Sequence, residues 1–365
     1  MFKLIFFCFI LPGFLPLVSF SQSSTKIDYD LVFNKAKYGQ KNLSLNPKYE
    51  KKLSFPELEK IEVIDARSDT TCIGFRNRNS EKNNQILQFT NGLKSEFESF
   101  FTRHGKYSQQ TNSYSAVVVV RNYWINEFEV DEDEKDKFTD NRSGWYNARK
   151  TALRETFDIY FVKNDEYYVA YRFDTIGAAF LNIKEFSETY LESILSNSLL
   201  RLQTINPQTH IVNKRKFTRS ELRDYYAGRW DKPILKDSTR EKGVYKNFAE
   251  FLNNKPSITS FVVKKDKLVD VLYVPVGKQD MAPARDVWGY CDGKNFFIKS
   301  GENYYPLVKV ENGFYFLGSK ELMKSQDDYY MYDPYMGMNM RASSEAYLRN
   351  RLYPMKVDME KGTTY

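Results

Sequence analysis

Residues 61–75, IEVIDARSDTTCIGF, constrain the fold more than any other stretch of this chain. The first five are rich in β-branched residues and stop at charged and turn-forming ones, which predicts a strand that ends near Asp65. In residues 84–103, apolar side chains recur mainly at three- and four-residue spacing. This spacing predicts a long amphipathic helix, and Gly105 is well placed to end it.

The next segments complete a first domain at 57–205. Residues 115–125 (SAVVVVRNYWI) are mostly apolar and β-branched, which predicts a central strand covered on both faces. Residues 156–162 and 167–173 predict a hairpin, and 184–202 predict a second long helix. The predicted order is β-α-β-β-β-α, which requires a mixed or antiparallel sheet with both helices on one face.

The second half of the chain is more β-rich. Residues 206–242 are predicted to be a linker that contains a short helix at 219–227, because Thr218 and Glu221 have the spacing of a capping box. Residues 243–326 predict an antiparallel β-meander of about six short strands with a short leading helix. Asp292-Gly293 and Asn312-Gly313 suit type I′ hairpin turns. The predicted fold class is therefore α+β, followed by a mainly antiparallel β domain and a Met/Tyr-rich segment at 327–365.

The beginning of the chain predicts export. Lys3 precedes an apolar run broken by Pro12, Gly13 and Pro16, and a small-x-small cleavage site lies before Gln22, so 1–21 are predicted to be a secretory signal peptide. Residues 22–56 are predicted to be a polar leader. No later segment approaches ~18 uninterrupted apolar residues, so no transmembrane segment is expected after cleavage. The predicted location is the periplasm, the outer membrane surface or the medium.

Charge and cysteine content limit the possible partners. The net charge of +7 is modest, and basic residues are interspersed with acidic ones, so no nucleic-acid partner is expected. Cys72 and Cys291 fall in different predicted domains. One disulfide between them and two buried free thiols are both consistent with the sequence.

No catalytic constellation is evident. His104 and His210 are the only histidines, which argues against His-based triads and multi-His zinc sites. We expect no enzymatic activity and no cofactor. The acidic run at 131–136 lacks the spacing of a calcium-binding EF-hand loop and predicts a solvated loop.

Asp65, Arg67 and Asp69 form the most distinctive charged cluster. If the strand continues through them, these alternating residues share one face, where a carboxylate and a guanidinium can pair. The cluster is either a recognition or acid–base site at the strand end or a structural ion pair. A carboxylate-dependent hydrolase would require Asp65 and Asp69 to lie together in a cleft.

Two further groups of residues are candidate binding sites. In the β domain, Trp288, Tyr290, Tyr304 and Tyr305 can form a glycan- or peptide-binding platform if exposed, although the same residues suit a strand core. Met331, Met336, Met338 and Met340 offer soft thioether ligands of the kind that select Cu(I). The alternative for these methionines is an adaptable apolar loop or partner surface.

A strand that ends in Asp-x-Arg and is soon followed by Ile-Gly, a helix and a long apolar strand resembles the YajG-like envelope lipoproteins of Gram-negative bacteria. The matching residues are Asp65, Arg67, Ile73 and Gly74. The chain departs from that family by lacking the lipid-attachment cysteine. In overall style it also resembles uncharacterised secreted proteins of Bacteroidota, which imply no particular activity. The resemblance implies a periplasm-facing, non-catalytic domain of uncertain role. Together with the predicted export and the lack of a catalytic constellation, it leads us to expect an exported envelope protein that binds a partner, with a glycan- or peptide-binding module as the alternative.

Overall fold

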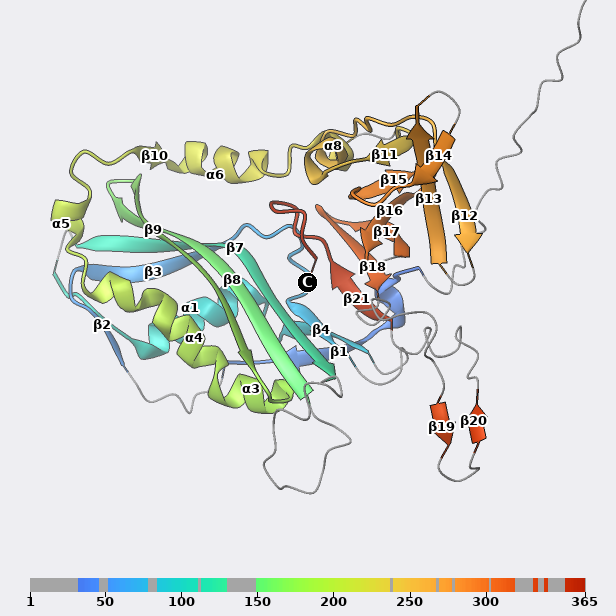
Figure 1. Cartoon of the computed structure of the whole chain (residues 1–365). Coiled ribbons are helices and arrows are strands. Elements are labelled where there is room, and N and C mark those ends of the chain that lie inside the picture. The colour runs from blue at the N-terminus through green and yellow to red at the C-terminus, as the bar shows by residue number, and fades with distance from the viewer. Residues whose placement is uncertain are drawn as a thin grey trace, which may run out of the picture.

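The computed structural model describes residues 32–45, 52–77, 84–110, 113–129, 149–236, 239–266, 269–277, 280–301, 303–318, 331–333, 338–340 and 352–364. They form an α+β structure with a large mixed sheet and a smaller antiparallel sheet (Figure 1). The predicted signal peptide at 1–21 and the acidic run at 131–136 lie outside the described residues.

The large sheet has eight strands in the order β1-β5-β4-β7-β8-β9-β10, and β3 pairs with β7 outside this path. The long strands β7 and β8 carry most of its ladder, and β8 and β9 form the predicted hairpin around Asn164 and Asp165, both at positive φ. The strands are β1 (Gly39–Leu43), β3 (Leu58–Asp65), β4 (Gly74–Arg76), β5 (Gln85–Phe89), β7 (Tyr114–Glu129), β8 (Arg149–Lys163), β9 (Glu166–Ala179) and β10 (Lys216–Thr218).

Two of these strands follow one another along the same edge of β7. The first half of β7 pairs with β3 in parallel, up to the Asp65 and Val120 register, and the second half pairs with β4 from Gly74 and Ile125 onward. The chain therefore leaves this edge after Asp65 and returns at Gly74. Gly74 has a φ of +150°, and a Cβ there would lie 1.7 Å from the carbonyl oxygen of Ile125. The close approach of β4 to β7 thus requires glycine at the Ile-Gly position.

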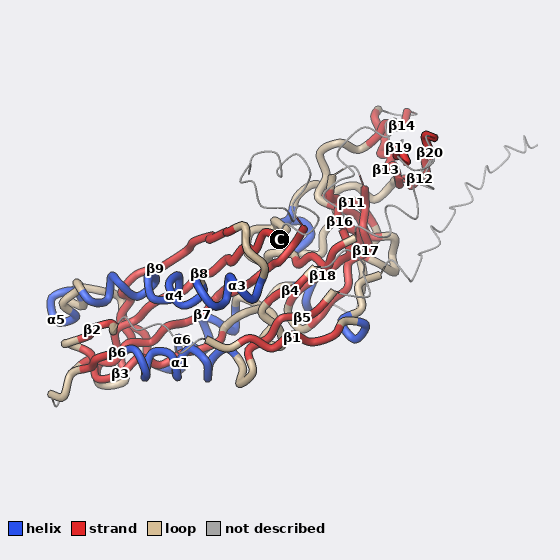
Figure 2. The backbone as a smooth tube through the Cα atoms, turned by 90° about the horizontal axis from the view of Figure 1, so that it is seen from below, coloured by secondary structure: helices blue, strands red, loops and turns tan. Residues whose placement is uncertain are grey.

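The helices α1 (Leu93–His104), α3 (Ile183–Thr189) and α4 (Leu191–Leu199) pack on one face of the sheet (Figure 2). Phe97, Phe186 and Leu195 bury their side chains there against strand residues such as Val118 and Phe157. The helix predicted at 84–103 is too long, because 85–89 form β5 and Gly92 marks the start of α1. The helix predicted at 184–202 divides at Tyr190 and continues as a 3-10 turn, η5 (Leu200–Gln203).

Residues 206–242 contribute to the large sheet and do not form a simple linker. After α5 (Pro207–His210), β10 pairs with β9, and α6 (Arg219–Gly228) crosses the sheet face opposite α1. Leu222 and Tyr226 of α6 pack there with Val117 and Tyr160. A further short helix, α7 (Pro233–Lys236), follows. The polar composition of this segment gave no sign that it packs on the large sheet, because only a few apolar residues make its contacts with that sheet.

The predicted leader at 22–56 also supplies strands. β1 pairs with β5 in parallel, and β2 (Leu53–Phe55) pairs with β6 (Gly105–Tyr107). A 3-10 turn, η2 (Lys35–Lys37), precedes β1. Short strands in polar surroundings carry little periodic signal, which is why sequence patterns missed them.

The second sheet has six antiparallel strands, including one from the end of the chain: β11 (Gly243–Tyr245), β15 (Gly289–Cys291), β16 (Phe296–Ser300), β17 (Asn303–Val310), β18 (Gly313–Gly318) and β21 (Tyr353–Lys356). The predicted leading helix is α8 (Phe248–Leu252), which comes after β11 and before the other strands of this sheet. A separate three-stranded sheet contains β12 (Val262–Asp266), β13 (Val269–Val276) and β14 (Asp280–Pro283), so the predicted single meander is divided. The type I′ prediction at Asn312-Gly313 is out of register, because Val310 pairs with Gly313 and Glu311 takes the positive φ.

The two larger sheets share one hydrophobic cluster. Phe75 and Trp124 of the large sheet pack with Tyr315 of β18, with ring centroids 5.3–6.1 Å apart. Phe33, which precedes β1, stacks on Tyr315 at 5.0 Å. The predicted boundary between the two halves is therefore a continuous buried interface, and the C-terminal segment lies between the sheets (Figure 1).

Candidate functional site

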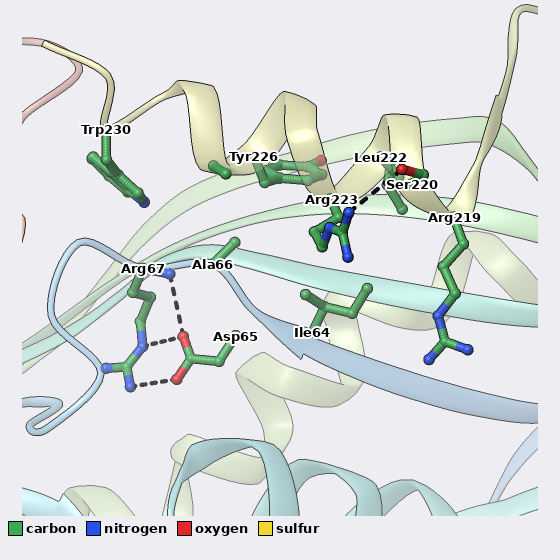
Figure 3. A pocket seen from close by; sticks show the side chains of 11 residues that line it. Ile64, Asp65, Ala66, Arg67, Arg219, Ser220, Leu222, Arg223, Tyr226 and Trp230 are labelled. Atoms are coloured by element: carbon green, nitrogen blue, oxygen red, sulfur yellow. Dashed lines mark hydrogen bonds and ion pairs between the residues drawn. The ribbon is translucent and has the colours of Figure 1, made fainter.

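A groove of about 540 Å³ lies between the end of β3 and helix α6 (Figure 3). One wall is formed by Ile64 and the residues that follow it, up to Arg67. The other wall is one face of α6 together with Trp230, which lies just beyond the helix. The lining residues are Ile64, Asp65, Ala66, Arg67, Arg219, Ser220, Leu222, Arg223, Tyr226, Ala227 and Trp230.

The local sequence fixes the position of α6 at its start and along one side. The Thr218 hydroxyl accepts a hydrogen bond from the Glu221 backbone N–H at 3.2 Å, and the Glu221 carboxylate accepts one from the Thr218 N–H at 2.7 Å. This is the predicted capping box, which supplies partners to otherwise unpaired N–H groups. Leu222 and Tyr226 anchor the helix by their apolar surfaces, and the Tyr226 hydroxyl donates to Asp158 at 2.7 Å.

Arg67 and Asp65 form a bidentate ion pair on the opposite wall. Arg67 Nε donates to Asp65 Oδ1 at 2.8 Å, and Nη2 donates to Oδ2 at 2.7 Å. The same guanidinium donates to the carbonyl oxygens of Thr70 and Cys72. Arg67 therefore holds the loop between β3 and β4 to the strand end, as a structural ion pair would. Arg67 is only 4% exposed, and its guanidinium is already engaged in these hydrogen bonds. It therefore forms part of the groove wall but offers little charge to a ligand.

Asp69 does not lie in the groove. The strand ends at Asp65, so the three charged residues do not alternate on one strand face, and the loop carries Asp69 into the interface between the sheets. There it accepts hydrogen bonds from the Tyr315 hydroxyl at 2.6 Å and from Thr71, and it pairs with Lys35 at 3.0 Å. Burial raises its pKa, but these hydrogen bonds and the neighbouring ammonium groups outweigh burial and hold the pKa well below its usual range. Asp65 and Asp69 therefore do not share a cleft of the kind a two-carboxylate hydrolase needs.

A buried lysine borders the same interface. The ammonium of Lys356 lies 4.6 Å from the ring centroid of Trp124, a cation–π contact. Burial lowers the pKa of Lys356 to about 8. Lys356, Asp69 and Tyr315 come from three distant segments, so this polar cluster helps to align the two sheets.

Arg219 and Arg223 give the groove its excess positive charge. Both are exposed and lie on the groove side of α6, with their guanidinium groups directed toward β3 (Figure 3). Among the described residues, no carboxylate lies within ion-pair distance of Arg219, and the pair between Arg223 and Asp224 is long, at 3.4 Å, and exposed. Since such surface pairs are weak, both guanidinium groups remain available to an anionic ligand. Of the described residues that line the groove, Asp65 alone carries a carboxylate, and Arg67 neutralises it.

A second ionic network closes the end of the groove near Trp230. Arg229 donates to the Ala66 carbonyl oxygen at 3.1 Å and to the Glu360 carboxylate at 2.7 Å. Glu360 also accepts from Arg121, which in turn pairs with Asp158 at 3.2 Å. The C-terminal segment thereby fixes the end of α6 relative to the strand that forms the other wall.

The structure places the other predicted site residues elsewhere. Tyr290, Tyr304 and Tyr305 are at most 8% exposed, and the ring of Trp288 packs at a tilt against that of Phe251, with centroids 4.2 Å apart. These four residues belong to hydrophobic cores and do not form an exposed aromatic platform. The glycan- or peptide-binding alternative required these rings to be exposed, and that condition is not met.

The methionine segment is described only in part. Met331 and Met340 pair across β19 (Met331–Asp333) and β20 (Met338–Met340), and Met336 lies outside the described residues. The proposed Cu(I) site on Met331, Met336, Met338 and Met340 stays a prediction. Among the described residues, no cluster of His, Cys, Asp and Glu side chains could hold a metal ion.

The histidines and cysteines have structural surroundings. His104 is buried against Phe100 with centroids 4.6 Å apart, and burial lowers its pKa. His210 Nε2 lies 3.1 Å from the carbonyl oxygen of Ala170. Cys72 and Cys291 are both buried and free, which is the second of the two alternatives left open by the sequence.

The sequence singled out Asp65 and Arg67 but missed the α6 side of the groove. The available signal was the spacing of Arg219, Leu222, Arg223, Tyr226 and Trp230, which places them on one helix face beyond the capping box. Comparison with known protein families, curated proteins and solved structures found no match. No helix among the described residues has both the length and the apolar character needed to cross a membrane.

Proposed function

We propose that this protein is an exported, non-catalytic envelope protein that binds a partner in the groove between β3 and α6. The observation that supports this most is the combination of two available guanidinium groups, on Arg219 and Arg223, with an apolar floor in one recess. Such a recess attracts an anionic group and buries apolar surface beside it. The predicted signal peptide at 1–21 and the resemblance to YajG-like envelope proteins support the location.

The geometry around the groove supports binding more than bond-breaking chemistry. Among the described residues that line it, Asp65 alone carries a carboxylate, which accepts two hydrogen bonds from the Arg67 guanidinium and one from the Arg67 backbone N–H. Paired carboxylates or a nucleophile with an adjacent base are the usual requirement for hydrolysis. A rigid wall of hydrogen-bonded loop opposite a capped helix is instead suited to holding a ligand in one orientation.

The experiment is affinity purification of a tagged copy from crosslinked native cells, followed by mass spectrometry. The wild type is compared with Arg219→Glu/Arg223→Glu and with Lys214→Glu/Arg215→Glu, which reverses two exposed charges outside the groove lining. We expect an envelope partner that the wild type and the control pair recover and the groove pair loses. Equal recovery by all three variants would contradict a groove-centred function.

A further inference from the structure

We infer that the groove recognises an extended peptide segment of the partner, with carboxylates at alternate positions and an apolar side chain close to Trp230. This inference rests on the proposed function and names the chemical class of the partner. It is carried by the spacing of charges and apolar residues along α6.

The spacing of the two arginines matches an extended chain. Arg219 and Arg223 are four residues apart on one helix, which separates them by about 6 Å along its axis. In an extended peptide, side chains that point the same way recur about every 6.6–6.8 Å. Two carboxylates at alternate positions can therefore each meet one guanidinium without distorting the peptide.

The length and floor of the groove also fit a short segment. From Arg219 to Trp230 the chain advances eleven residues, about 16 Å if it were helical throughout, which corresponds to about five extended residues. Leu222, Tyr226 and Trp230 form the apolar part of the α6 wall, and Ile64, which is 39% exposed, faces them from β3. Leu222 and Tyr226 are only 1% and 5% exposed, so the apolar surface open to a peptide is that of Ile64 and of the half-buried Trp230, which lies beyond the arginine pair.

The arrangement favours a peptide over a single phosphate group or a lipid surface. The guanidinium groups of Arg219 and Arg223 are directed into the recess as separate groups (Figure 3). A lone phosphate would gain most from converging donors, whereas separate carboxylates match separate guanidiniums. The accessible apolar side chains, those of Ile64 and Trp230, line the recess, which favours a single chain over a flat surface.

The test uses the chain from residue 22 onward and a labelled pentapeptide, acetyl-Glu-Ser-Glu-Ser-Phe-amide, in fluorescence anisotropy at low salt; extended, it presents both carboxylates and the Phe ring on one face. The comparison peptide, acetyl-Glu-Glu-Ser-Ser-Phe-amide, has the same composition and the same terminal Phe, but its two carboxylates are adjacent. We expect the alternating peptide to bind about tenfold more tightly than the permuted one, a difference of roughly one charge-assisted contact. Arg219→Glu/Arg223→Glu should abolish this preference, and Lys214→Glu/Arg215→Glu should preserve it.

Equal binding of the two peptides, or preference retained by the groove pair, would overturn the inference. So would stronger competition from inorganic phosphate or from vesicles of anionic phospholipid than from unlabelled alternating peptide. These outcomes are distinct from failure of the proposed function. If the proposed function itself fails, the native partner is recovered equally by the wild type and by Arg219→Glu/Arg223→Glu.

Discussion

The hydroxyl of Tyr315 donates a 2.6 Å hydrogen bond to the carboxylate of Asp69, across 246 residues of sequence. Tyr315 belongs to the six-stranded sheet, and Asp69 belongs to the loop that joins β3 to β4 in the large sheet. Both are fully buried. The same loop carries Arg67 into the wall of the groove, so the sheet interface and the candidate binding site are mechanically connected.

Tyr315→Phe should destabilise the fold, because it removes a donor from a buried carboxylate and leaves the ring in place. We expect the free energy of unfolding to fall by about 1–3 kcal/mol. Urea denaturation measures the change. Tyr225→Phe, on a side chain that is 48% exposed, is the matched control and should change stability by less than about 0.5 kcal/mol. Equal effects of the two substitutions would show that the hydrogen bond between Tyr315 and Asp69 does not stabilise the interface.

Glu155 gives the protein a specific pH dependence. It lies on the helix-covered face of β8, is fully buried, and neither carboxylate oxygen has a hydrogen-bond partner among the described residues. Burial raises the pKa of Glu155 to about 8 from an ordinary value of 4.5. The folded state therefore keeps a proton that the unfolded state loses, and this contribution to stability is complete below pH 4.5 and is lost as pH rises to 8.

Glu155→Gln should flatten this dependence, because the amide does not titrate. Between pH 5 and 7.5, the free energy of unfolding of the variant minus that of the wild type should rise by up to about 1.4 kcal/mol per pH unit. Urea denaturation at several pH values measures it. Glu188→Gln, on an exposed helix residue, should leave the wild-type slope unchanged. Parallel curves for wild type and Glu155→Gln would show that Glu155 is ionised in the folded state.

Glu360→Gln should weaken the attachment of the C-terminal segment. The Glu360 carboxylate accepts from Arg121 and Arg229, both at 2.7 Å, and its side chain is 30% exposed. We expect a loss of about 1–2 kcal/mol, reduced by added salt because the network is only partly shielded from solvent. Denaturation at low and high salt tests both statements. Glu62→Gln, in an exposed pair with Lys60, should show a much smaller loss.

The two thiols should be inert in the folded protein. Cys72 is 1% exposed and Cys291 is fully buried, and burial raises the pKa of both. For the chain from residue 22 onward, a thiol reagent at pH 7.5 should label neither under native conditions. Both should react after unfolding without reductant. Failure of unfolded protein to react until reductant is added would reveal a disulfide.

Strong local patterns predicted the parts of the fold that depend on local sequence. The β8–β9 hairpin followed from two apolar strands around Asn164 and Asp165, and the capping box of α6 followed from Thr218 and Glu221. The structure of residues 85–89 was harder to predict, because the sequence QILQF fits one turn of an apolar helix face as well as a short strand. Pairing with β1 and β4 decides in favour of the strand, and that long-range contact has no local signal.

The candidate site was only half visible for the same reason. Asp65 and Arg67 stand out because their charges are close in sequence, and their pairing could be expected. The opposite wall, with Arg219 and Tyr226, lies more than 150 positions away, and only the folded sheet brings it beside β3. The position of Asp69 could not be predicted, because it depends on a partner hydroxyl from the far end of the chain.

The most direct measurement is photo-crosslinking from opposite sides of α6. A photoreactive amino acid at Ala227 faces the groove, whereas one at Tyr225 lies on the same helix but outside the groove lining. We predict that the Ala227 probe captures an envelope partner in native cells, that the Tyr225 probe does not, and that Arg219→Glu/Arg223→Glu abolishes the capture. Capture from Tyr225 alone, or capture that persists after both charge reversals, would contradict a function centred on this groove.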